Sequence, residues 1–262
     1  MKIGVMVESF RRDFKEAVKI AAEIGAQGIQ KYCTHDYYMT DAQARELLDI
    51  VTSHGLVFSA LCGDFGHGFT DPAKNPELID KSKRVLELSK KLGCNIVTTH
   101  IGVVPEEENE TKEILRKACR ELAEFGDSIG AYFAVETGPE KAVVLKEFLD
   151  SLGAKGVRVN FDPANLVMCV GDNAAEAAKV LGPYIVHTHA KDGRMIGNME
   201  GWEELPLGQG DVNFDEYLPA LASTGFNGFL TIEREVGDNP EADIRMAADF
   251  LREKLAKFGL DK

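Results

Sequence analysis

The 262-residue chain has few of the features that mark membrane-spanning or secreted proteins. No apolar run approaches the roughly 20 residues of a membrane span, and the apolar stretch after Met1 is too short for a signal peptide. The five cysteines are scattered, odd in number and form no CxxC pair. They favour reduced thiols in a cytoplasmic protein over a disulfide framework or a structural zinc site.

Positive charge is also scarce. The chain has 30 Lys and Arg against 43 Asp and Glu, which gives a formal net charge of −13. Contact with nucleic-acid phosphates needs a basic surface, so we expect no nucleic-acid partner. Apolar residues make up 44% of the chain, and no Pro/Ser-rich linker divides it. Length and composition therefore predict one large α/β domain across residues 1–262.

A short pattern recurs along the chain: a helical stretch ends in an apolar residue plus glycine, and a strand begins soon after. Ile129-Gly130 precedes YFAVE, and Leu181-Gly182 before YIVHTH is a close variant. Glycine just past a helix end takes a left-handed conformation that other residues resist. Seven such joints and a spacing of about 33 residues predict a (β/α)8 barrel. The expected strands are residues 2–7, 28–32, 56–62, 95–100, 132–136, 157–162, 184–190 and 228–233, with a last helix at 240–257.

Four of the expected strands end in residues that can bind a metal: Glu136, Asp162, His189 and Glu233. An acidic residue at the end of an apolar strand is costly unless it is paired or bound to a cation. Alternation within the strands places these residues on the more polar face, which would be the barrel interior. We therefore expect the four side chains to meet at the barrel mouth around one divalent ion. Buried ion pairs, with Arg158 as a partner, are the alternative.

Five motifs at or near these strand ends carry a family resemblance. They are ETGPE (136–140), NFDPANL (160–166), HAKD (189–192), LPLGQGD (205–211) and IERE (232–235). In this order the chain resembles the xylose-isomerase-like TIM-barrel superfamily of sugar and sugar-phosphate isomerases and epimerases. The resemblance implies that Glu136, Asp162, His189 and Glu233 hold one divalent metal ion. Mn²⁺, Mg²⁺ and Co²⁺ suit oxygen-rich ligation with one imidazole, and Zn²⁺ is possible.

The resemblance also implies a chemistry for a small sugar or sugar phosphate. Removal of a proton beside a carbonyl produces an enediolate, which a divalent ion stabilises as a Lewis acid. Glu136 and Glu233 would be the catalytic acid and base. The result is epimerisation or aldose–ketose isomerisation. Expulsion of a β-hydroxyl from the same enediolate gives the alternative, a keto-sugar or inosose dehydratase on the same scaffold.

Two further readings have less support. Many ketose 3-epimerases, and the related endonucleases, carry a histidine three residues after the aspartate, where this chain has Asn165. This difference weakens assignment to the 3-epimerases and, with a pI of about 5.0, argues against a DNA-repair phosphodiesterase. A non-catalytic sugar-binding barrel would lack a key carboxylate, and none is missing here. A homo-oligomer is expected from the resemblance alone.

Five residues are candidates for substrate binding: Glu140, His100, Arg194, Trp202 and Asn165. Glu140 would reach substrate hydroxyls or place charge at a helix N-terminus. His100 would orient the substrate or pack in the core. Arg194 would pair with a hydroxyl or phosphate or remain a solvated loop charge, and Trp202 would stack on a sugar or anchor its loop.

Four other residues complete the expected surroundings. His187 lies two residues before His189 on the same strand face, and we expect it to support the site from behind. Lys191 and Asp192 are expected to pair with each other and steady the following loop. Glu8, at the end of the first strand, is a weaker candidate for a substrate contact.

Overall fold

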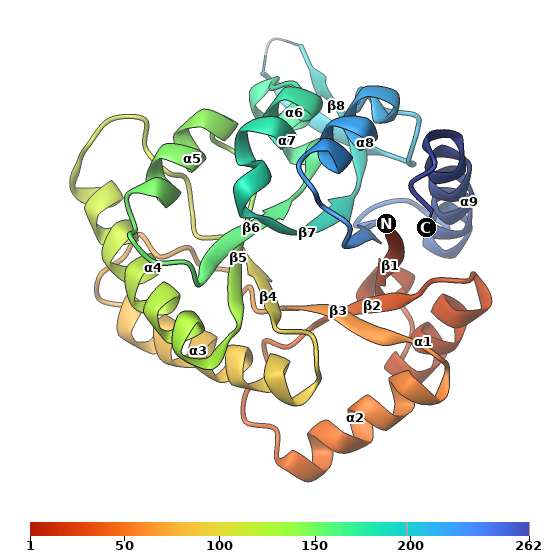
Figure 1. The fold of residues 1–262 in the computed structure, drawn as a ribbon, viewed down its shortest axis with the longest axis horizontal. Helices are drawn as coiled ribbons and strands as arrows, with labels where there is room; N and C mark the ends of the chain where they lie inside the picture. Colours follow the sequence, from red (N-terminus) through yellow and green to blue (C-terminus); the bar gives the residue numbers. More distant parts are fainter. Residues whose placement is uncertain (198, 262) are drawn as a thin grey trace.

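Eight parallel strands close into a barrel in the computed structural model, which describes residues 1–197 and 199–261 (Figure 1). The barrel strands are β1 (Lys2–Met6), β2 (Gly28–Tyr32), β3 (Val57–Cys62), β4 (Ile96–Thr99), β5 (Tyr132–Glu136), β6 (Val157–Phe161), β7 (Ile185–Ala190) and β10 (Phe229–Ile232). Their order is β1-β10-β7-β6-β5-β4-β3-β2, so the sheet closes on itself. The predicted (β/α)8 fold is confirmed, with every barrel strand within one residue of its expected ends.

Helices fill the connections and cover the outside of the barrel (Figure 1). They are α1 (Phe14–Glu23), α2 (Asp41–Ser53), α3 (Asn75–Lys91), α4 (Glu110–Ile129), α5 (Ala142–Asp150), α6 (Pro163–Val170), α7 (Ala174–Leu181), α8 (Phe214–Ser223) and α9 (Pro240–Phe258), with 3-10 turns η1 (Val7–Phe10) and η2 (Gly182–Tyr184). In α4 the buried Leu115, Cys119 and Leu122 recur at helical spacing and form the face that packs inward. Within the described residues, none of these helices combines the length and apolar character needed to cross a bilayer.

The inside of the barrel is polar, as the strand alternation predicted. Its buried polar residues include Gln30, Ser59, Thr98, Asn160, His187 and Thr231. They satisfy one another across the barrel. Gln30 Nε2 donates to Thr98 Oγ1 at 2.7 Å, and His187 lies 2.8 Å from both Asn160 Oδ1 and Thr231 Oγ1. Residues of the other parity, such as Phe133, are buried in the apolar core.

An antiparallel hairpin that the sequence pattern did not predict interrupts the barrel after β7. Its strands are β8 (Asp192–Ile196) and β9 (Gly201–Leu205), with Met195 paired to Trp202. The hairpin packs against α6 and lies beside it at the top of Figure 1. Its strands mix charged and apolar residues, so they carry a weak period-two signal.

The glycines at the helix ends confirm the predicted joints, with one difference. Gly130 ends α4 with φ 67°, the left-handed conformation expected there. Gly182 instead has φ −44°, because the chain continues into η2. A Cβ at Gly182 would lie 2.6 Å from Thr224 Cγ2, so close packing is the reason that a glycine suits this position.

Candidate active site

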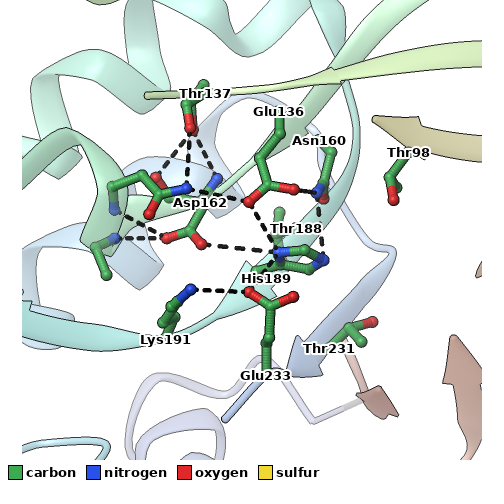
Figure 2. A network of polar contacts seen from close by, with 12 residues as sticks. Thr98, Glu136, Thr137, Asn160, Asp162, Thr188, His189, Lys191, Thr231 and Glu233 are labelled. Atoms are coloured by element: carbon green, nitrogen blue, oxygen red, sulfur yellow. Dashed lines mark hydrogen bonds and ion pairs between the residues drawn. The ribbon is translucent and has the colours of Figure 1, made fainter. Parts of the chain in front are cut away.

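The four predicted ligands converge at the carboxyl end of the barrel. Glu136 ends β5, Asp162 follows β6, His189 lies in β7 and Glu233 follows β10. One ligand atom from each lies within 4.8 Å of the others, and all four residues are buried. His189 Nδ1 is 3.4 Å from Glu136 Oε1, 3.4 Å from Glu233 Oε2 and 3.7 Å from Asp162 Oδ2. Figure 2 shows Glu136 and Glu233 on opposite sides of the imidazole.

Asp162 is oriented by the helix that it begins. It is the N-cap of α6, and its Oδ1 accepts the backbone N–H groups of Ala164 at 2.8 Å and Asn165 at 3.1 Å. A carboxylate at a helix N-terminus is favoured by these donors and by the helix dipole. Because capping occupies Oδ1, Oδ2 is left to face the other three ligands.

His189 is oriented by a residue from the opposite side of the barrel. Its Nε2 lies 3.0 Å from Oε1 of Gln30 in β2, whose amide nitrogen donates to Thr98. The Gln30 oxygen can only accept, so Nε2 carries a proton, and Nδ1 faces the carboxylates, where its lone pair would be available to a bound ion. This is the arrangement by which proteins fix a metal-binding imidazole.

Glu136 is held by side-chain amides. Asn160 Nδ2 donates to its Oε2 at 3.1 Å, and Asn165 Nδ2 donates to its Oε1 at 3.1 Å. The Asn160 oxygen lies 2.8 Å from Nδ1 of His187, whose Nε2 lies 2.8 Å from Thr231. Both nitrogens of His187 are therefore engaged, as expected for a residue that supports the site from behind.

Glu233 is held by a cation. Lys191 Nζ lies 3.1 Å from Glu233 Oε2 and also pairs with Glu235. The expected pair between Lys191 and Asp192 is wrong. Asp192 instead accepts backbone N–H groups, including those of Gly193, Gly208, Gly210 and Val212. Asp192 thus steadies the loop without Lys191, because neighbouring residues of an extended chain point to opposite sides.

These charges shift the pKa values of the site in the metal-free protein. Burial alone would lower the pKa of His189, but Glu233 and Glu136 raise it well above its ordinary value. Burial would raise the pKa of Glu233, yet His189 and Lys191 hold it well below its usual range. Burial would lower the pKa of Lys191, and the carboxylates of Glu233 and Asp162 raise it instead. The cluster is therefore strongly anionic and keeps nearby cations charged.

The cluster fits a divalent cation. Among the described residues, Asp162 Oδ2 and His189 Nδ1 are buried without a hydrogen-bond partner. Leaving such atoms unpaired is costly, and both belong to the group of atoms that an ion would contact. Three carboxylates and one imidazole form a ligand set suited to hard or borderline divalent ions.

His100 and Glu140 lie near the cluster. His100 is half exposed; its Nδ1 lies 2.6 Å from Asp64 Oδ2 and its Nε2 lies 3.6 Å from Glu136 Oε1. The charge of Glu136 raises the pKa of His100 to about 9. Glu140 is buried and accepts the N–H of Val104 at 3.3 Å, and burial raises its pKa to about 8.

Three other predicted substrate residues have different positions. Asn165 donates a hydrogen bond to Glu136, one of the four candidate ligands. Arg194 and Trp202 lie on the β8–β9 hairpin, where Arg194 pairs with Glu203 at 2.6 Å and Trp202 is 54% exposed. Their roles in substrate binding stay predictions.

Most of the chain matches a known family in sequence. The family model described as "Xylose isomerase-like TIM barrel" matches residues 18–254. The chain belongs to this family. The predicted resemblance is thereby confirmed.

Two relatives span most of the chain. An uncharacterized protein of Methanocaldococcus jannaschii, MJ1311, is 23% identical over 251 residues, which cover 90% of this chain and 84% of the relative. L-ribulose-5-phosphate 3-epimerase UlaE of Escherichia coli is 22% identical over 233 residues, which cover 83% and 79%.

Solved structures share the family fold along their full length. A xylose isomerase domain protein from Planctomyces limnophilus matches with a TM-score of 0.87 and 24% identity, over 98% of this chain and 97% of that one. D-psicose 3-epimerase from Clostridium cellulolyticum H10 matches with a TM-score of 0.78 and 17% identity, over 97% of this chain and 99% of that one. The probable 3-DHS dehydratase AsbF from Bacillus anthracis matches with a TM-score of 0.76 and 20% identity, over 96% of this chain and 99% of that one. At these identities the likeness shows the fold.

Sequence reasoning missed two supporting residues of this family member. Gln30 orients His189, and Asp64 orients His100. Asp64 lies two residues beyond β3, outside the strand-end positions at which the four candidate ligands were found. Gln30 had a weaker signal, because it lies in the middle of β2 next to the charged Lys31.

Two cavities border residues of the site: Glu233 lines one, and Asp64, the partner of His100, lines the other. One, of about 220 Å³, is lined in part by Glu8, Tyr32 and Glu233. The other, of about 630 Å³, includes Asp64 in its wall and extends over the loops that follow β2 and β3. Glu8 and Glu233 line the same cavity, and the substrate contact of Glu8 stays a prediction.

Proposed function

We propose that the chain is a divalent-metal-dependent isomerase or epimerase that acts on a small sugar or sugar phosphate. The observation that carries the proposal is the pair Glu136 and Glu233. They come from different strands, flank His189 and belong to one four-residue metal-ligand group (Figure 2). Membership of the family and the likeness to two named 3-epimerases support it.

Each side chain of the site has a role in this reaction. Glu136, Asp162, His189 and Glu233 would hold the ion, which would supply Lewis-acid stabilisation of charge on the substrate oxygens. One of Glu136 and Glu233 removes a proton beside the carbonyl, and the other returns a proton on the opposite face.

Two neighbouring residues would position the substrate. Because its pKa is about 8, Glu140 is mostly protonated at neutral pH and can donate a hydrogen bond to a hydroxyl. His100 is oriented by Asp64 with its Nε2 toward Glu136, and its half-exposed ring can donate to a substrate oxygen. Mn²⁺, Mg²⁺ and Co²⁺ are the proposed ions, with Zn²⁺ as a further candidate.

A dehydratase is the second candidate. The Asp64–His100 pair supports it, because this pair is a third acid–base group beside the two carboxylates. Such a group could protonate a departing β-hydroxyl after proton removal at the neighbouring carbon. The likeness to the probable 3-DHS dehydratase is consistent with this chemistry on the same fold.

The test is proton–deuterium exchange followed by NMR. Mn²⁺-loaded protein is incubated in D₂O with a panel of ketoses, ketose phosphates and inososes. We expect exchange at the carbon beside the carbonyl, and the exchanged carbon identifies the reaction. Loss of water with an absorbing dicarbonyl product would favour the dehydratase.

Glu136→Gln is the active-site variant, and Glu147→Gln on the exposed side of α5 is the matched control. The control should exchange at the rate of the unaltered chain, and Glu136→Gln should not. Absence of exchange on every compound by protein shown to bind Mn²⁺ would contradict the proposed function.

A further inference from the structure

Lys191 is a buried cation next to the proposed metal site. It follows β7 by one residue and lies two residues after His189, so both side chains point into the barrel. Only 5% of its side chain is exposed. A buried ammonium is costly unless carboxylates surround it, and Lys191 contacts three.

The three carboxylates come from two parts of the chain. Glu233 Oε2 lies 3.1 Å from Lys191 Nζ, Glu235 pairs with it, and Glu204 Oε2 lies 3.7 Å away. Glu204 belongs to β9, and its side chain is 1% exposed. The β8–β9 hairpin therefore places the buried carboxylate of Glu204 beside Lys191.

The oxygen that Lys191 holds is also the one that faces the metal-ligand cluster. Glu233 Oε2 is 3.4 Å from His189 Nδ1 and 3.1 Å from Lys191 Nζ. Figure 2 shows Lys191 and His189 converging on Glu233. Lys191 thus fixes the orientation of the Glu233 carboxylate and also partly neutralises its negative charge.

The charges of the buried groups around Lys191 show how its contact with Glu233 bears on metal binding. The buried carboxylates are Glu136, Asp162, Glu233 and Glu204, and the buried cations are Lys191 and Arg234. Arg234 Nη1 pairs with Glu204 Oε1 at 2.7 Å. With His189 neutral, as it would be when it binds an ion, this set lacks two positive charges, which one divalent ion would supply. Glu235 is 52% exposed, so water screens its charge.

We propose that Lys191 is a positioning residue that couples Glu204 of the hairpin to Glu233 and sets how tightly the site binds its divalent ion. The proposal rests on the metal site of the proposed function and is independent of the substrate. With Lys191 present, the metal-free site is partly compensated, so an ion gains less on binding. Without Lys191, the ion meets an additional uncompensated negative charge.

The test is calorimetric titration of Mn²⁺ into metal-stripped protein at pH 8. In Lys191→Met the Mn²⁺ Kd should fall by about tenfold, because a positive charge near the ligand oxygen is removed. The melting temperature of the metal-free variant should fall, and the rise in melting temperature on adding Mn²⁺ should exceed that of the unaltered chain. Lys191→Arg should restore the original Kd within a few-fold, because the charge returns.

Glu204→Gln tests the same idea in the opposite direction. Removing this carboxylate leaves Lys191 facing Glu233 with less competition, so the Mn²⁺ Kd should rise by about tenfold. General damage to the fold would weaken Mn²⁺ binding in both variants. Opposite changes in the two therefore support the proposal.

Lys254→Met is the matched control, because Lys254 pairs with Asp215 on the outside of the barrel at 2.5 Å. It should leave the Mn²⁺ Kd unchanged. Equal or weaker Mn²⁺ binding by Lys191→Met would overturn the proposal. A chain that binds Mn²⁺ with these shifts but exchanges no sugar proton would contradict only the proposed function.

Discussion

The two acidic ends of the site are supported in different ways. On the β5–β6 side, Glu136 and Asp162 accept hydrogen bonds from neutral amides and backbone N–H groups. At the open edge of this side the half-exposed His100 lies 3.6 Å from Glu136, and the buried His189 faces both sides. On the β7–β10 side, Glu233 accepts from buried Lys191 within a network of ion pairs.

This difference separates two physical tasks. Neutral donors fix the position of a carboxylate and change its charge environment little. A buried ammonium fixes the position and also offsets the negative charge on which metal binding depends. We therefore expect substitutions on the first side to act through geometry and hydrogen bonding, and those on the second to act through metal affinity.

The largest expected effect is on the rate of proton exchange, and it tests whether Glu136 and Glu233 serve the same reaction. Glu136→Gln and Glu233→Gln should each reduce the rate of proton exchange by roughly 10²- to 10⁴-fold, the usual contribution of a positioned acid or base. Exchange is measured by NMR at saturating Mn²⁺. If one variant retains nearly full exchange, the two carboxylates do not share the proton transfer.

A pH series tests whether Glu140, near the β5–β6 side, is uncharged in the folded protein. The pKa of Glu140 is raised to about 8, so its native form keeps a proton that the unfolded chain loses near pH 4.5. The contribution of this proton to the free energy of unfolding is fully present below about pH 4.5 and is lost as the pH rises through 8. Glu140→Gln should therefore be more stable than the unaltered chain at pH 9, by on the order of 3 kcal/mol.

The measurement for Glu140→Gln is urea unfolding at pH 5 and pH 9. The difference in the free energy of unfolding should nearly vanish at pH 5. An equal difference at both pH values would mean that the carboxyl of Glu140 is charged in the folded protein throughout this range.

Removal of the amide that supports Glu136 should lower stability. Asn160→Ala leaves the buried Glu136 and His187 each without a hydrogen-bond partner that Asn160 provides. We expect the free energy of unfolding to fall by about 2–3 kcal/mol, measured with urea. Thr188→Ala, a buried strand residue of β7, is the comparison, because its hydroxyl donates a single hydrogen bond to the Phe229 carbonyl. A smaller loss for Asn160→Ala than for Thr188→Ala would contradict the importance of the amide.

The smallest effect concerns the residue that orients His189. Gln30→Leu removes the acceptor for Nε2 but changes no charge. Mn²⁺ affinity should fall by about 10- to 100-fold, as is typical when support of a metal-binding histidine is lost. Calorimetric titration checks this value. Unchanged affinity would show that packing alone orients the imidazole.

The sequence by itself determined the barrel and the positions of the four candidate ligands. Glycines after helices and apolar strands are local signals, and strand alternation needs no knowledge of distant contacts. Because all strands of such a barrel end at one face, residues such as Glu136 and Glu233 had to converge once the fold was known. A cytoplasmic location and a homo-oligomer were also expected from the sequence, and both stay predictions.

Only the tertiary structure decided how the ligands are supported. Gln30 reaches His189 across 159 positions of sequence, and Lys191 pairs with Glu204 and Glu233 instead of its neighbour Asp192. These partners depend on closure of the barrel and on the return of the hairpin. The physical reason is that local patterns set the direction of a side chain, whereas long-range packing sets which charge or donor it meets there.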